Sequence, residues 1–122
     1  MSETVAIFGA GGKLGRHILA SLAGRGYQVR ALVHRTPVEG EGIVSISGSI
    51  TDAAAVHETV RGADIVVHLA TTKEDSDTFF DVSLKGTFHI LEACRHHKVK
   101  QVILLGGDAA LGIWFYPQLI PL

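Results

Sequence analysis

The sequence predicts an α/β fold: a doubly wound parallel sheet of about five strands, in the order 3-2-1-4-5, between two layers of helices. Two observations carry this prediction. Short apolar runs alternate with helical patterns along the chain, which is typical of proteins built from βαβ units. In addition, the first apolar run, Val5–Phe8, ends in a glycine-rich loop that leads directly into a helical pattern. A strand, a helix and a second strand in that order form a right-handed crossover between parallel strands.

The composition indicates one globular domain with an apolar core. The chain has 122 residues, of which 47% are hydrophobic, and a formal net charge of −1. This balance gives no basic surface for nucleic acid or an anionic membrane, and no apolar stretch reaches the roughly 18 residues of a spanning helix. The single cysteine, Cys94, excludes an internal disulfide. We therefore expect a cytoplasmic protein that binds neither nucleic acid nor a membrane.

The first half of the chain supplies three of the predicted strands. Val5–Phe8 is apolar on both faces, as buried parallel strands are. A helix follows from about residue 12 to residue 24, with Gly26 as its C-terminal cap. Three residues are expected on its buried face: Leu14, Ile18 and Leu22. The next two strands are predicted at Gln28–Val33 and Ile43–Ile46.

The second half continues the alternation. Thr51 or Asp52 is the expected N-cap of a helix over Ala53–Val60, which Gly62 ends. Asp64–Ala70 and Gln101–Leu105 read as the fourth and fifth strands. A long helix between them is predicted over residues 78–97, and its expected buried residues are Phe79, Val82, Gly86, Ile90 and Ala93 or Cys94.

Histidines in this half are assigned to the core or the surface. His68 lies inside an apolar strand, where a core role is more usual than a catalytic one. His96 and His97 are adjacent in a predicted helix, so their side chains diverge and make a poor metal pair. We predict no metal site.

The glycine loop predicts an anion site. Its glycines follow the pattern Gly9-x-x-Gly12-x-x-Gly15, with an additional Gly11, between a strand and the first turn of a helix. The unpaired N–H groups and the positive dipole end of that helix attract a phosphate, and glycines let a diphosphate approach the backbone. The spacing is a variant of the dinucleotide fingerprint and differs from the phosphate loop of ATP and GTP sites. Lys13 adds positive charge there, and Leu14 completes the predicted cofactor loop.

The end of the second predicted strand favours NADP over NAD. A carboxylate about 20 residues beyond the glycines would bind the ribose 2′-hydroxyl of NAD. Here His34 and Arg35 occupy that region, and Glu39 is the first acid after it. An arginine pairs with a 2′-phosphate that a carboxylate would repel. The alternatives are NAD as the cofactor and a purely solvated role for Arg30 and Arg35.

Four motifs in order make the chain resemble the short-chain dehydrogenase/reductase superfamily, in its extended and atypical branch of NAD(P)-dependent epimerases, dehydratases and reductases. They are the glycine loop and the segments 48–52 (GSITD), 68–70 (HLA) and 81–87 (DVSLKGT). The resemblance implies a Rossmann fold. It also implies that Ser49 and the Ile50 backbone contact adenine, and that Leu69, Ala70 and Thr71 line the path of the ribose and nicotinamide.

The resemblance does not extend to the family's catalytic residues. Members carry a serine or threonine after the fifth strand and then a Tyr-x-x-x-Lys pair for proton transfer. In this chain glycines occupy the expected hydroxyl positions, and Tyr116 is followed four residues later by Ile120. The catalytic residues therefore stay unassigned. An enzyme that uses Asp108 or Tyr116 as its acid, supported by His68, is one alternative.

Residues 113–122 form an apolar tail after a predicted dinucleotide-binding domain over residues 1–112. Such a tail must pack against something, and in a complete family member the following half would cover it. We expect an amino-terminal piece of a longer protein, which binds a dinucleotide without being catalytically complete. The alternative is a non-catalytic dinucleotide sensor or interaction module, with the tail forming a homodimer.

Overall fold

The protein is described by a computed structural model over residues 3–10, 13–34, 38, 40–69 and 84–104. Its elements in chain order are β1 (Thr4–Phe8), α1 (Lys13–Gly24), β2 (Gln28–Val33), β3 (Ile43–Ser47), α2 (Ala53–Val60), β4 (Ile65–His68), α3 (Gly86–His96) and β5 (Gln101–Leu104). Each predicted strand and helix has a counterpart within these residues, but α3 begins at Gly86, and residues 78–83 of the helix predicted over 78–97 lie outside the described part.

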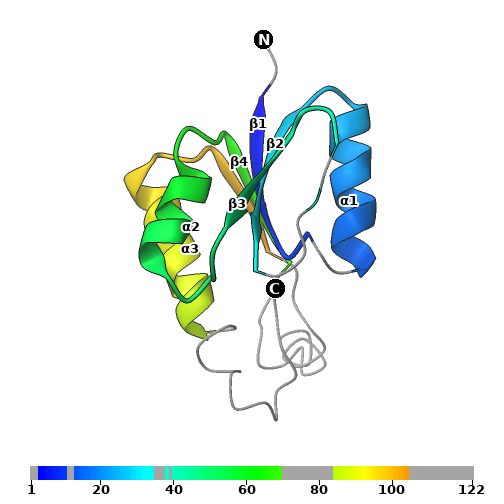
Figure 1. The fold of residues 1–122 in the computed structure, drawn as a ribbon. Coiled ribbons are helices and arrows are strands. Elements are labelled where there is room, and N and C mark those ends of the chain that lie inside the picture. The colour runs from blue at the N-terminus through cyan, green and yellow to red at the C-terminus, as the bar shows by residue number, and fades with distance from the viewer. Residues whose placement is uncertain (1–2, 11–12, 35–37, 39, 70–83, 105–122) are drawn as a thin grey trace, which may run out of the picture.

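The five strands form one parallel sheet in the order β3-β2-β1-β4-β5, as predicted. The helix α1 covers one face, and α2 and α3 lie together on the other (Figure 1). At the carboxyl end of the central strand, Phe8 is in register with Leu32 of β2 and His68 of β4. The strand order reverses between β1 and β4, so the ends of these two strands flank the topological switch point.

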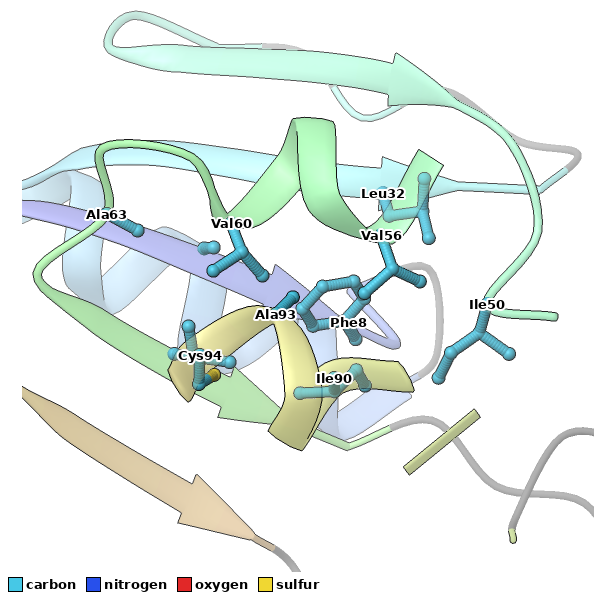
Figure 2. Packing of buried hydrophobic residues seen from close by; sticks show 11 residues of the cluster. Phe8, Leu32, Ile50, Val56, Val60, Ala63, Ile90, Ala93 and Cys94 are labelled. Carbon is cyan, nitrogen blue, oxygen red and sulfur yellow. The ribbon is translucent and has the colours of Figure 1, made fainter. Parts of the chain in front are cut away.

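The alternating side chains of β1 divide the core into two clusters. Ala6 and Phe8 face α2 and α3, where they pack with residues such as Val56 and Ile90 (Figure 2). Val5 and Ile7 face α1 and pack in a second cluster. These four of the five side chains of β1 are at most 1% exposed, which explains why the strand is apolar on both faces from Val5 to Phe8.

The helix α1 packs differently from the sequence prediction at its first turn. Ile18 and Leu22 contact the sheet cluster as expected, but Leu14 is 49% exposed. The buried anchor is instead Leu19, which is 5% exposed. The prediction for Leu14 was wrong because its position in the first turn leaves it beyond the packed part of the helix. Gly26 adopts a φ of 90° just after the helix, and this supports the predicted cap.

Two side chains fix the ends of α2. The carboxylate of Asp52 accepts a hydrogen bond from the N–H of Ala54 at 3.0 Å, so Asp52 is the N-cap. At the other end, the Nη1 group of Arg30 donates to three main-chain carbonyl oxygens, those of Glu58, Thr59 and Arg61. Arg30 is therefore a cap for another helix, rather than a purely solvated surface charge.

The helix α3 buries Gly86, Ile90, Ala93 and Cys94, as predicted. Burial raises the pKa of the Cys94 thiol to about 11, so the side chain behaves as part of the core. The earlier part of the predicted helix, including Phe79 and Val82, lies outside the described residues. In the parts of the chain that the structure covers, no helix is long and apolar enough to cross a membrane.

Candidate dinucleotide site

Glycine is required where β1 passes into α1. Gly9 has a φ of 94°, a backbone conformation that side chains disfavour. A Cβ on Gly15 would lie 2.1 Å from the carbonyl oxygen of Gly9 and 2.7 Å from the Cα of Ala10. The first turns of α1 therefore pack directly against the backbone that leaves β1. These conditions explain why positions 9 and 15 are glycines, while Gly11 and Gly12 lie outside the described residues.

The first turn of α1 carries no acidic side chain, so no carboxylate offsets the positive end of its dipole. The helix begins at Lys13, and the exposed side chain of Leu14 follows. This end of α1 lies at the carboxyl edge of the sheet, beside the switch point. Its N–H groups are thus placed where a ligand phosphate would bind in a doubly wound fold.

The predicted residues at the end of β2 are only partly described. His34 follows the strand and is exposed, whereas Arg35 lies outside the described residues. Arg30, by contrast, reaches the C-terminal end of α2. Arg30 is thus engaged within the protein, and of the two arginines only Arg35 is still a candidate to bind the 2′-phosphate of a ribose.

The segment between β3 and α2 is held tightly. The Ser49 hydroxyl lies 2.8 Å from the Thr51 hydroxyl and accepts a hydrogen bond from the Thr51 N–H at 3.1 Å. The Ile50 side chain is buried in the core cluster, and its carbonyl oxygen lies 3.2 Å from Nδ1 of His89. Ser49 and Ile50 thus sit at the carboxyl edge after β3, but the carbonyl of Ile50 is already engaged within the protein.

The end of β4 lies beside the end of β1. The N–H of Leu69 donates to the carbonyl oxygen of Phe8 at 2.7 Å, which extends the pairing of the two strands. Nε2 of His68 lies 2.9 Å from the Thr87 hydroxyl, and its ring makes an edge contact with Phe8. His68 is 6% exposed, as its predicted core role requires. Four other predicted or candidate residues lie outside the described part of the chain: Ala70, Thr71, Asp108 and Tyr116.

Burial lowers the pKa of His68. Its Nδ1 atom is buried and has no hydrogen-bond partner among the described residues. An unpaired nitrogen in an apolar setting disfavours the protonated imidazolium. His68 is therefore held neutral at the edge of the candidate site.

Three residues near the start of α3 support this edge, and the sequence analysis did not assign them these roles. Thr87 contacts His68, and His89 contacts the Ile50 carbonyl. A Cβ on Gly86 would lie 2.9 Å from the Ile50 side chain, so glycine lets α3 approach that residue. The motif over residues 81–87 contained the signal for Gly86 and Thr87, but their contacts with distant strands are tertiary.

The sequence profile of the NAD-dependent epimerase/dehydratase family matches residues 5–113. The chain belongs to this family. Among related proteins, a uronate dehydrogenase from Pseudomonas putida is 31% identical over 114 residues, which cover 90% of this chain and 42% of that protein. An L-arabinose 1-dehydrogenase (NAD(P)(+)) from Haloferax volcanii is 35% identical over 92 residues, which cover 73% of this chain and 35% of that protein. The chain thus spans less than half the length of these relatives.

Solved structures support the same fold. A mutant uronate dehydrogenase from Agrobacterium tumefaciens, complexed with NAD, has a TM-score of 0.79 at 22% identity, covering 88% of this chain and 42% of that one. A UDP-glucose 4-epimerase from Thermus thermophilus, also complexed with NAD, has a TM-score of 0.70 at 26% identity, covering 81% of this chain and 36% of that one. The family's Rossmann architecture, expected from the four motifs, is confirmed.

The contact at Gly15 predicts a large difference between two glycine substitutions in α1. Gly15→Ala should lower the free energy of unfolding by about 1–3 kcal/mol and weaken dinucleotide binding, because its methyl group displaces the helix from Gly9. Gly24→Ala should raise stability by about 0.5–1 kcal/mol, since no atom lies within 4 Å of the added Cβ. Urea denaturation and cofactor titration of both variants measure these effects. Equal stability of the two variants would contradict the assigned packing.

The burial of His68 predicts that the protein loses stability on acidification. The unfolded chain takes up this proton near the ordinary pKa of 6.5, while the folded chain resists it. The stabilisation is therefore complete above about pH 6.5 and is lost as the pH falls below it. His68→Gln should reduce the slope of stability against pH, measured by urea denaturation between pH 8 and pH 5. The slope should persist in part, because the pKa of His97 is lowered too, by partial burial and then by His96, His57 and Arg61.

His17→Gln, which removes an exposed imidazole from α1, is the matched control for this measurement. If His68→Gln and His17→Gln leave the same slope as the unsubstituted protein, buried His68 is not a source of the acid sensitivity.

Proposed function

We propose that this chain is the dinucleotide-binding domain of an epimerase, dehydratase or reductase, with NADP preferred to NAD. The observation that carries the proposal is the junction of β1 and α1, where Gly9 and Gly15 bring an acid-free helix N-terminus beside the switch point. Membership of a family described as NAD dependent supports a nicotinamide dinucleotide as the ligand. The domain is proposed to extend over residues 1–112.

The proposed binding mode places the diphosphate on the N–H groups of the glycine loop and the first turn of α1. The adenine would lie near Ser49 and Ile50, after β3. The ribose and nicotinamide would lie beyond Leu69, along Ala70 and Thr71. These positions follow β3, β1 and β4, which lie in that order in the sheet with β2 between β3 and β1, so one extended ligand can reach all of them along the carboxyl edge.

The preference for NADP rests on charge at the end of β2. Residues 34–36 read His-Arg-Thr and contain no carboxylate for a ribose 2′-hydroxyl. A guanidinium at Arg35 can form two charge-assisted hydrogen bonds with a 2′-phosphate. The relative from Haloferax volcanii carries NAD(P)(+) in its name, and the cited structures are complexes with NAD.

Isothermal titration with NADPH and NADH tests both parts of the proposal. NADPH should bind more tightly, and Arg35→Gln should weaken NADPH binding about tenfold or more while leaving NADH binding unchanged, because a charged hydrogen bond contributes about 1.5–3 kcal/mol. Arg25→Gln, an exposed arginine in the turn after α1, is the matched control and should leave both affinities unchanged. If neither NADPH nor NADH binds, the assignment of a dinucleotide-binding domain is refuted. Equal affinities for NADPH and NADH refute only the NADP preference.

We further propose that the 122-residue chain does not by itself complete catalysis. A hydride transfer from or to the nicotinamide needs a partner acid or base, and the sequence contains no Tyr-x-x-x-Lys pair. A dinucleotide sensor is the second candidate function, and the glycines at the expected serine or threonine positions after the fifth strand favour it. Residues 113–122, which lie outside the described part, are the proposed homodimer contact. The single buried cysteine is compatible with the proposed cytoplasmic location.

The turnover test uses the substrates named for the relatives. With a uronate or L-arabinose and NAD or NADP, the isolated chain should bind the cofactor without reducing it. Formation of NADH or NADPH is measured by the absorbance of the reduced nicotinamide. Turnover that Tyr116→Phe or Asp108→Asn abolishes would instead show a complete enzyme with unusual residues.

A further inference from the structure

Three histidines gather where α2 and α3 end, far along the chain from one another. His57 lies in the last turn of α2, and His96 and His97 lie at the end of α3. Nδ1 of His57 is 3.2 Å from Nε2 of His97. The ring centroid of His57 is 5.3 Å from that of His97 and 5.6 Å from that of His96. The prediction that the side chains of His96 and His97 diverge was wrong, because their ring centroids lie 4.8 Å apart in an edge contact. Their contacts with His57 could not be predicted from spacing, because His57 comes from another helix.

This cluster lies away from the candidate dinucleotide site. Both helices run from the carboxyl edge of the sheet towards its amino edge, so their C-terminal ends meet at the edge opposite the glycine loop (Figure 1). At that edge the Asp64 carboxylate binds the N–H of Thr4 at 2.9 Å. The histidines are therefore free of any role in holding the cofactor phosphates.

The separation of the two nitrogens suits a shared metal ion. Two imidazole nitrogens that each lie 2.0–2.1 Å from one zinc ion are about 2.9–3.4 Å apart for coordination angles between 90° and the tetrahedral value. The distance between His57 Nδ1 and His97 Nε2 falls within this range. In the metal-free protein the same pair has one proton between the two nitrogens. Metal binding requires His57 to carry its proton on Nε2 and His97 to carry its proton on Nδ1, so that the lone pairs of both facing nitrogens are available.

The surroundings limit which ion fits. Among the described residues no group of three histidine, cysteine or acidic side chains is placed to hold a metal, so water must complete the coordination. Glu58, the nearest acid along α2, is paired with Arg61 at 2.7 Å. Imidazole ligands without a carboxylate favour borderline transition metals such as Zn²⁺ and Ni²⁺ over Mg²⁺, which prefers oxygen.

We propose that His57 and His97 form a two-histidine chelate for a divalent transition metal ion, which joins the C-terminal end of α2 to that of α3. The ion cross-links two helices through histidines that are 40 residues apart in sequence. Because the folded chain presents both nitrogens together, and the unfolded chain does not, the ion binds the folded state preferentially. The site therefore makes the stability of the domain depend on metal.

The test is thermal unfolding and isothermal titration of the chain prepared without a polyhistidine tag, with Zn²⁺, Ni²⁺ and Mg²⁺ as probes. At a concentration about 100-fold above the dissociation constant, Zn²⁺ or Ni²⁺ should raise the Tm by several degrees. Chelation with EDTA should reverse the rise, and Mg²⁺ should produce none. Saturating NADPH should leave the zinc affinity unchanged, since the two sites lie at opposite edges of the sheet.

Substitutions identify the ligands. His57→Gln and His97→Gln should each weaken zinc binding at least tenfold, while His96→Gln and His17→Gln should leave it within about twofold. The proposal is overturned if Zn²⁺ and Ni²⁺ do not bind, if binding survives in His57→Gln or His97→Gln, or if His17→Gln loses it equally.

A measurement on the unsubstituted protein tests the proposal even if the histidine variants fail to fold. In nitrogen NMR spectra of the imidazoles, Zn²⁺ should produce the shift of a coordinated nitrogen in two of the seven histidines. Such shifts in histidines other than 57 and 97 would assign the ion elsewhere and refute the proposed pair.

Discussion

The burial of Val5–Phe8 in β1 is the constraint on which the rest of the structure depends. A strand with side chains at most 1% exposed on both faces needs a helix layer on each side and a paired strand at each edge. To cover both faces of the sheet, the chain places α1 on one face and α2 and α3 on the other (Figure 1). The strand order therefore reverses between β1 and β4, and this reversal is the switch point. The arrangement also brings the start of α1 so close to the backbone after β1 that position 15 has no room for a side chain. The candidate cofactor site is thus a consequence of how the core is covered.

Much of this arrangement follows from local patterns in the sequence. Apolar runs at Val5–Phe8 and Gln28–Val33, separated by one amphipathic helix, suffice to predict two parallel strands joined by a crossover helix. The glycine spacing suffices to locate the loop, because Gly9 and Gly15 meet conditions that only glycine satisfies. The N-cap at Asp52 is equally local, since its carboxylate binds an N–H two residues away.

Contacts between distant segments could not be predicted in the same way. Periodicity places Leu14 on the same face as Ile18, but only the position of the sheet decides that the first turn is exposed. The contact of Gly86 with Ile50 and the pairing of His57 with His97 join segments 36 and 40 residues apart. Nothing in the spacing of those residues reveals which side chains meet. The proposed preference for NADP depends on the charge of Arg35, which lies outside the described residues.

The hydrogen bonds from Arg30 to the end of α2 affect how the domain assembles. An eight-residue helix is too short to persist alone in water, because few of its peptide groups can form internal hydrogen bonds. Here its last carbonyl oxygens are satisfied by a guanidinium from β2, 28 to 31 residues earlier in the chain. The final turn of α2 therefore gains its partner only when β2 is already in place. Helix completion and sheet assembly become one cooperative event, and the amide hydrogens of that turn share the protection of the central sheet instead of exchanging as a separate unit.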